Sequence, residues 1–249
     1  MWVWREAREK WLLSAAFGAL ILIVLINLKL PVWPPLNGGQ AAAFLRAEAT
    51  ANVTSDLLVG LFSAYVFYVI VELIPRHRRE QLTLKPLNML AAAVIDAYER
   101  VRVFGHETPI TSIDLAVLDI QRLKVHKSEL VTQKDILKVK FAMETGHSRY
   151  SDFQHALAMA ASISPEHALS WLVLTDKVRL LAEKYGQWPV NPFLDSSLGL
   201  PTDEQREDAK LMDAYYKYQK DMESIEGTLR LRTVEVIEAT ISWMQHQAS

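Results

Sequence analysis

The stretch that decides the fold lies near the N-terminus, where residues 11–28 read WLLSAAFGALILIVLINL and include no charged side chain. At about 1.5 Å per residue, an α-helix of this length crosses the roughly 30 Å hydrocarbon core of a bilayer. A surface helix of a soluble domain keeps a polar stripe, which this stretch lacks. Trp11 and Trp33 bracket it, as aromatic residues do at membrane interfaces. We therefore expect an uncleaved transmembrane helix over about residues 11–30, because its apolar core is longer than that of a typical signal peptide.

A second apolar stretch, residues 57–74, reads LLVGLFSAYVFYVIVELI and predicts a second span over about residues 55–74. Its small residues Gly60, Ser63 and Ala64 are spaced for close helix contact. They fit either packing of the two spans against each other or a seam between subunits. A segment with several prolines and glycines separates the two stretches. Residues 1–80 are therefore expected to form a membrane domain, a two-span transmembrane helical hairpin.

The only charged residue of the second stretch is Glu72. A carboxylate inside a span is a functional candidate by default, because a charge in hydrocarbon is costly. Glu72 also precedes Arg76 by four residues, the spacing at which side chains on one helix face can pair. It is therefore either half of a structural ion pair near the membrane interface or a residue of an ion pathway.

The distribution of lysine and arginine around the two stretches predicts the topology. Basic residues lie before the first stretch and after the second: Arg5, Arg8, Lys10, Arg76, Arg78, Arg79 and Lys85. The segment between the stretches carries only Lys29 and Arg46. Since cytoplasmic segments are enriched in these residues, we expect the N-terminus and the C-terminus to be cytoplasmic, with the two spans in a cell inner membrane.

Residues 81–249 predict a cytoplasmic helical domain, because helix start and stop signals recur and strand patterns are nearly absent. The signals predict helices over residues 86–104, 112–125, 132–145, 151–161 and 165–185. Gly146 is interpreted as a helix stop, and Ser164 followed by Pro165 as a helix start. Thr202 and Gln205 form a capping box at the start of a long C-terminal helix. The expected fold class is thus all-α, a hairpin followed by a helical bundle.

The C-terminal helix carries an apolar seam in which steps of four and three residues alternate. The seam consists of Leu211, Tyr215, Tyr218, Met222, Ile225 and Leu229. It fits one long helix of a bundle, two helices divided near Gly227, or a coiled coil that joins subunits.

Composition excludes several classes of function. The chain contains no cysteine, which excludes disulfides, thiolate metal sites and thiol catalysis. The formal net charge of −2 argues against a nucleic-acid partner. No phosphate-binding loop, dinucleotide fingerprint or serine nucleophile elbow occurs in the sequence. The pairs Glu144–His147 and Asp152–His155 have the spacing of di-iron ligands but lack accompanying inward glutamates, so we expect no metal and no other cofactor.

Arg149 and His155 form an R-x5-H pattern, which resembles the short motif of the HEPN ribonucleases, an all-helical and dimeric family. The resemblance implies that these two residues would cleave RNA by positioning and acid–base work. It covers two residues only, and Arg100 and His106 share the same spacing.

A run of basic residues crosses two expected helices and comprises Arg122, Lys124, Lys127, Lys134, Lys138 and Lys140. Lys134 and Lys138 share a helix face at the i,i+4 spacing. With Arg122 they are candidates for binding an anionic small molecule, such as a nucleotide, or acidic lipid headgroups. The alternative is a solvated face balanced by Glu129 and Asp135.

Three functions fit these features. The first is an oligomeric membrane effector or channel, because two spans per subunit line a pore only in a homo-oligomer. In this reading the cytoplasmic domain senses a signal and gates or permeabilises the membrane, a layout that resembles the two-span effectors of bacterial antiphage defence. The second is a membrane-anchored scaffold or adaptor that docks a cytoplasmic protein. The third is a membrane-tethered HEPN-like ribonuclease. The first is preferred, since a plain anchor needs neither small-residue faces nor an intramembrane carboxylate.

Overall fold

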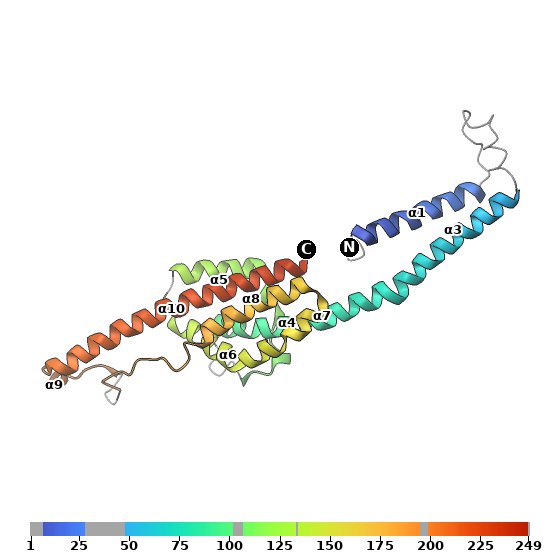
Figure 1. Cartoon of the computed structure of the whole chain (residues 1–249). Helices are drawn as coiled ribbons and strands as arrows, with labels where there is room; N and C mark the ends of the chain where they lie inside the picture. The colour runs from blue at the N-terminus through green and yellow to red at the C-terminus, as the bar shows by residue number, and fades with distance from the viewer. Residues whose placement is uncertain (1–6, 28–47, 102–106, 133, 195–198, 249) are drawn as a thin grey trace. The chain divides into compact units, whose positions relative to one another are not determined.

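The computed structural model describes residues 7–27, 48–101, 107–132, 134–194 and 199–248. Every regular element in these ranges is a helix and none is a strand, so the all-α prediction is confirmed (Figure 1). The chain divides into two compact units, Met1–Gln81 and Leu82–Ser249. They are called the N-terminal unit and the C-terminal unit.

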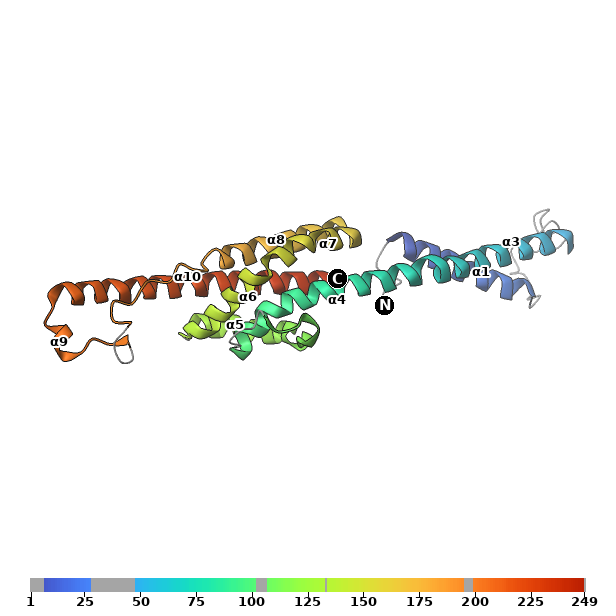
Figure 2. The ribbon, with the colours of Figure 1, turned by 90° about the horizontal axis from the view of Figure 1, so that it is seen from below.

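The N-terminal unit contains α1 (Ala7–Asn27) and α3 (Glu48–Tyr68), which pack along each other (Figure 2). Small residues of α1 are buried, since Ala16 and Ala19 are each 3% exposed, whereas Phe17 is 61% exposed. Small residues let two helices approach closely. Large apolar side chains that point outward are the reverse of a soluble core and fit apolar surroundings.

One helix among the described residues, Thr54–Arg100, is long and apolar enough to cross a membrane. Its most apolar window has a mean hydropathy of 2.3, and only 6% of that window is buried. The expected second span, residues 55–74, lies within this helix. The expected first span, residues 11–30, runs past the described end of α1, so one of the two expected spans is found. The segment expected between the spans lies mostly outside the described residues.

A π-helical turn, η3 (Val69–Leu73), joins α3 to α4 (Ile74–Arg100). The Ile74 N–H donates to the Val69 carbonyl, five residues back instead of four. Pro75 accounts for this turn, because proline has no N–H and its ring would clash with the carbonyl four residues back in a regular α-helix. The wider turn carries the helix past Pro75 without a break.

The C-terminal unit is built around the last turns of α4. Its other elements are η5 (Ile110–Ser112), η6 (Leu115–Leu118), α5 (Ile120–Thr132), α6 (Ile136–His155), α7 (Leu157–Ile163), α8 (Pro165–Ala182), α9 (Asp203–Arg206) and α10 (Ala209–Ala248). Between Leu87 and Tyr98, α4 is buried on almost every side. Its run of alanines, Ala91 to Ala93, leaves room for neighbouring side chains, as expected of the central helix of a bundle.

Two tryptophans fill the core of this unit. Trp171 stacks on Phe153 with ring centroids 5.3 Å apart and meets Trp243 edge-on at 5.2 Å. The Trp171 indole donates to the Phe153 carbonyl at 3.0 Å, and the Trp243 indole donates to the Asn88 side chain at 2.8 Å. Gln247 also donates to Asn88, so a polar side chain of α4 is tied to the end of α10. Buried indole N–H groups need such partners.

The helix expected to begin at Pro86 was placed wrongly, because α4 runs through this residue. Pro86 leaves the carbonyl of Leu82 without its helical donor. Leu82 is 72% exposed, so water can bond this carbonyl and the helix continues.

The expected stop at Gly146 is also wrong, since the glycine lies inside α6 and is buried. A Cβ at this position would lie 3.6 Å from Val178 and 3.9 Å from Leu181, both on α8. Gly146 therefore serves close packing of α6 on α8 and does not cap a helix. The same helix begins at Ile136, later than expected, where the Asp135 side chain accepts from a backbone N–H.

Two capping signals are confirmed. The Ser164 hydroxyl accepts from the His167 N–H at 3.2 Å at the start of α8. Both halves of the Thr202–Gln205 capping box are present, but they begin only the short α9. The long C-terminal helix α10 begins at Ala209 and continues through Gly227 without a division.

The apolar seam of α10 already has contacts within the chain. Leu229 is buried in the core, and further toward the start of α10 the ring of Tyr215 lies 5.3 Å from that of Phe193. Phe193 belongs to the segment between α8 and α9 and is 2% exposed. This segment therefore covers part of the seam that was also interpreted as a coiled coil between subunits, an alternative that stays a prediction.

Replacement of Gly146 tests the contact between α6 and α8. Gly146→Ala is expected to raise the free energy of unfolding by up to about 1 kcal/mol, because its Cβ makes ordinary contacts and alanine favours the helix. Gly146→Leu is expected to lower it by about 1–3 kcal/mol, because the longer side chain meets Val178 and Leu181. Denaturant unfolding of the full chain in detergent, followed by tryptophan fluorescence, measures both. Equal loss in both variants would contradict the packing role.

Candidate functional site

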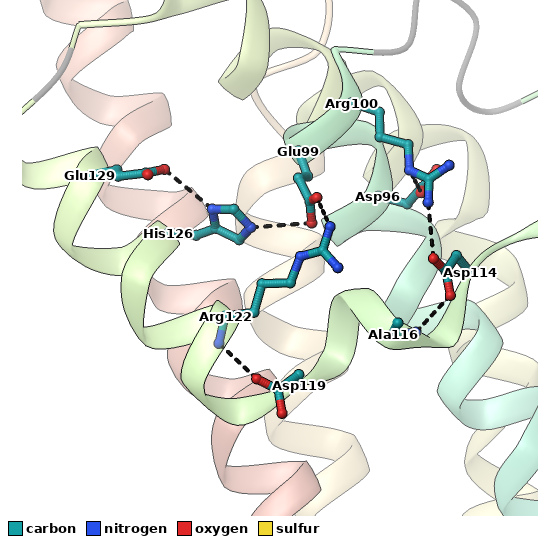
Figure 3. A network of polar contacts seen from close by, with 9 residues as sticks. All are labelled: Asp96, Glu99, Arg100, Asp114, Ala116, Asp119, Arg122, His126 and Glu129. Carbon is teal, nitrogen blue, oxygen red and sulfur yellow. Dashed lines mark hydrogen bonds and ion pairs between the residues drawn. The ribbon is translucent and has the colours of Figure 1, made fainter.

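A cluster of charged side chains joins the last turn of α4 to α5 (Figure 3). Glu99 of α4 accepts hydrogen bonds from Arg122 and His126, which lie one turn apart on α5. The His126 Nε2 atom is 3.2 Å from Glu99, and its Nδ1 atom is 3.3 Å from Glu129. These four residues, Glu99, Arg122, His126 and Glu129, are called the α4–α5 cluster.

His126 is held between two carboxylates. An ionised carboxylate only accepts hydrogen bonds, so both ring nitrogens of His126 must donate if both contacts are to form. The side chains of His126 and Glu99 are 11% and 16% exposed. Arg122 and Glu129 are 39% and 34% exposed, so Glu99 and His126 are the shielded members of the cluster, where polar contacts are stronger than in bulk solvent.

The surroundings shift the titration of Glu99 and of its neighbour Tyr98. Burial alone would raise the pKa of the Glu99 carboxyl, but the hydrogen bonds and charges of Arg122 and His126 outweigh it and lower this pKa below its usual value. Burial, reinforced by the negative charge of Glu129, raises the pKa of the Tyr98 phenol to about 12.

The ring of Tyr98 connects the cluster to α6. The ring meets that of His126 edge-on, with centroids 5.5 Å apart. The Lys138 Nζ atom lies over the Tyr98 ring, 5.6 Å from its centroid. A cation over an aromatic face is attracted by the ring quadrupole, so α6 also contributes to holding this end of α4.

A second set of contacts ties the same end of α4 to the segment before α5 (Figure 3). Arg100 lies 2.9 Å from Asp96 and 3.1 Å from Asp114. The Asp114 carboxylate also accepts from the backbone N–H two residues on, at the start of η6. Asp119 accepts from the backbone N–H of Arg122 at the start of α5. The carboxylates therefore fix the turns that present Arg122 to Glu99.

This arrangement is suited to holding a helix in place. Each charged group of the α4–α5 cluster faces an opposite charge, and the bonds run between elements that are distant in the sequence. In the part of the chain that the structure describes, no three histidine, aspartate or glutamate side chains gather as a set of metal ligands.

The three candidate anion-binding residues each contact a different group of the chain. Arg122 bonds to Glu99, and Lys138 lies over Tyr98. Lys134 lies 3.3 Å from Glu223 of α10, and both of these side chains are largely exposed. Arg122 therefore lies inside the α4–α5 cluster, Lys138 lies beside it, and Lys134 lies on the surface.

Arg149 and His155, the candidate ribonuclease pair, both lie on α6. Arg149 donates to the Thr108 carbonyl at 2.9 Å and lies 3.5 Å from Asp152. His155 is exposed at the last residue of the helix. Six residues at about 100° each turn the two side chains roughly 120° apart, so α6 does not present them on one face.

The small residues of the second span, Gly60, Ser63 and Ala64, are exposed. A Cβ built on Gly60 would meet nothing within 4 Å. The intermediate burial of Phe62 and Tyr65 instead marks the side of α3 that packs on α1. The small-residue face is thus left open along α3 in the single chain.

Glu72 lies in the π turn and is exposed. Among the described residues, no ion pair links it to Arg76, which makes other contacts. The π turn explains the difference from the sequence expectation, because an i→i+5 turn is wider and no longer stacks side chains four residues apart.

Sequence reasoning missed the α4–α5 cluster. Arg122, His126 and Glu129 are separated by steps of four and three, which places them on one helix face, and this part of the pattern is visible in the sequence. Glu99 lies 23 residues before Arg122, and no local signal connects it to α5.

Comparisons with known proteins give no relative for this chain. No protein-family model matches it, and neither the curated proteins nor the solved structures contain a match.

Removal of the Glu99 charge tests the cluster. Glu99→Gln is expected to lower the free energy of unfolding at pH 7 by about 1–3 kcal/mol, because Arg122 and His126 lose their shared carboxylate in a poorly solvated place. The lowered pKa means that the carboxylate stabilises the fold above its usual value of 4.5, and that this stabilisation is lost as the pH falls through the lower folded value. Denaturant unfolding at pH 7 and pH 3.5 measures the difference.

The matched control is Glu183→Gln, which removes a glutamate paired with Arg179 where both side chains are well exposed. Its effect is expected to be far smaller, because exposed ion pairs contribute little. A Glu99→Gln loss no larger than that of the control, or one that does not shrink at pH 3.5, would contradict the role of the cluster.

Proposed function

We propose that this chain is an oligomeric membrane effector, channel-like in form, whose C-terminal unit responds to a signal and changes the permeability of the membrane. The observation that carries the proposal is the single helix Thr54–Arg100, which runs unbroken from an exposed apolar segment into the buried core of the C-terminal unit. A helix continuous over that length is a stiff connection. A displacement at one end is therefore felt at the other.

The N-terminal unit supports a two-span hairpin within this proposal. α1 packs along α3, its alanines are buried, and large apolar side chains such as Phe17 and Phe67 are exposed. This pattern suits lipid surroundings, because outward apolar side chains cost nothing there. The lysine and arginine distribution supports a cytoplasmic location of the C-terminal unit, with the spans in an inner membrane.

Oligomer formation is supported by the open face of α3. Gly60, Ser63 and Ala64 are exposed although small residues in spans commonly mark helix contacts. A second subunit packed on this face would bury it. Two helices per subunit do not enclose a pore, so a ring of several subunits is needed, and Glu72 would lie near its cytoplasmic end.

The α4–α5 cluster provides the coupling. Glu99 and Arg100 bond α4 to the segment Asp114–His126, so a signal that moves this segment also moves the end of α4. The membrane segment lies on the same helix. The layout analogy with two-span antiphage effectors gives the proposed biological setting, bacterial defence.

A second candidate function is a membrane-anchored scaffold. The observation that favours it is an exposed apolar face on α8, where Leu169, Leu172 and Val173 are 64%, 50% and 48% exposed. Neighbouring exposed apolar side chains on one helix are typical of a protein contact. In this case the N-terminal unit acts as an anchor and no permeability change follows.

The mass of the detergent-solubilised full chain, measured by light scattering with correction for bound detergent, tests the oligomer. We expect a discrete assembly of four or more subunits. Gly60→Leu is expected to dissociate it, because the added side chain blocks close helix contact. Val59→Leu is the control, since this position already carries a large apolar side chain and the change adds a single methylene. A monomer or dimer in the wild type would contradict the proposal.

Potassium efflux from vesicles tests the permeability change. The full chain is expected to release potassium, and Glu99→Gln is expected to alter the rate because the end of α4 is held less firmly. Glu183→Gln should leave the rate unchanged. Glu72→Gln is expected to reduce the preference for cations over anions. Efflux equal to that of protein-free vesicles in every variant would contradict the channel and favour the scaffold.

A further inference from the structure

Basic side chains of two helices converge at one end of the helix pair in the N-terminal unit. The Arg8 guanidinium at the start of α1 donates to the Tyr68 hydroxyl at the end of α3, over 3.3 Å. This contact brings the first turn of α1 beside the end of α3. Exposed basic residues lie on both sides of it: Arg8 and Lys10 on α1, and Arg76, Arg78 and Arg79 in the first turns of α4, where the apolar segment ends.

The two stretches that carry these cations, residues 8–10 and 72–80, contain five arginines and lysines and three glutamates. One of the glutamates, Glu9, is 7% exposed and lies within the helix pair, away from the surface.

An exposed tryptophan marks the level of this basic end. Trp11 directly follows Lys10 in α1 and is 78% exposed. Tryptophan is enriched at the headgroup level of membranes, where one part of the indole is apolar and the N–H is wet. Tyr68 lies at the same level, as its contact with Arg8 shows. Cations, an indole and a phenol at the edge of an apolar segment form the chemistry of a membrane interface.

We infer that this end of the helix pair binds anionic phospholipid headgroups and selects them over zwitterionic ones. The inference rests on the proposed membrane location of the N-terminal unit. Each lysine or arginine near a charged membrane surface favours acidic lipid about fivefold, and the attraction falls off with salt. The five exposed cations, named here the basic collar, therefore gather acidic lipids around the cytoplasmic end of the spans.

Trp11 supplies a native reporter for the test. The full chain is reconstituted in mixed vesicles of phosphatidylglycerol and phosphatidylcholine, with bromine on the acyl chains of one lipid or the other. Bromine quenches tryptophan fluorescence on contact. The difference between the wild type and Trp11→Phe isolates the Trp11 signal from the other tryptophans. We expect Trp11 to be quenched several-fold more when bromine is on phosphatidylglycerol at equal mole fraction.

Charge variants show whether the basic collar causes the preference. Lys10→Gln with Arg78→Gln is expected to reduce the preference several-fold, because two of the five cations are replaced by neutral polar side chains. The control is Lys217→Gln with Lys220→Gln, two exposed lysines of α10, and it should keep the wild-type preference.

The outcomes separate this inference from the proposed function. Equal quenching of Trp11 by the two brominated lipids would overturn the lipid selectivity and leave the spans in place. Quenching by neither lipid would overturn the membrane location itself, and with it the inference. A preference that survives in the Lys10 and Arg78 variant would show that the basic collar does not select the lipid.

Discussion

The burial of α4 between Leu87 and Tyr98 is the constraint on which the rest of the C-terminal unit depends. A helix buried on almost every side accepts neighbours all round it, and the alanines Ala91 to Ala93 make that possible. The polar groups at both ends of this stretch then need partners. Asn88 accepts a hydrogen bond from Trp243 of α10, and Glu99 accepts one from His126 of α5. These bonds determine where the surrounding helices lie along α4.

The same helix begins in a different environment. In the N-terminal unit small side chains are buried and large apolar ones are exposed, which fits lipid on the outside. The π turn Val69–Leu73 lets the helix pass Pro75 without ending. One continuous helix therefore begins with exposed apolar side chains and ends in a buried core. Ion pairs of the α4–α5 cluster hold the last turn of this helix.

Local signals in the sequence predicted local features. The apolar run of residues 57–74 predicted the span, and Ser164 and Thr202 marked helix starts, because capping depends only on neighbouring residues. Gly146 was misinterpreted because its meaning depends on distant atoms, those of Val178 and Leu181 on α8. Neighbouring residues in the sequence do not indicate ion pairs such as Lys134–Glu223, whose partners are 89 residues apart. Glu99 was missed for this reason.

The proposed function requires one stiff helix from the exposed apolar segment to the core of the C-terminal unit. The distance between spin labels at Phe67 and Lys85 tests it most directly, since both side chains are exposed and the chain has no native cysteine to interfere. Eighteen residues of continuous helix span about 27 Å. Pulsed electron–electron double resonance on the Phe67→Cys, Lys85→Cys variant, with a spin label on each cysteine, should give one narrow distribution of label-to-label distances near that value. A broad distribution, or two separate distances, would show a hinge in the helix and contradict the account.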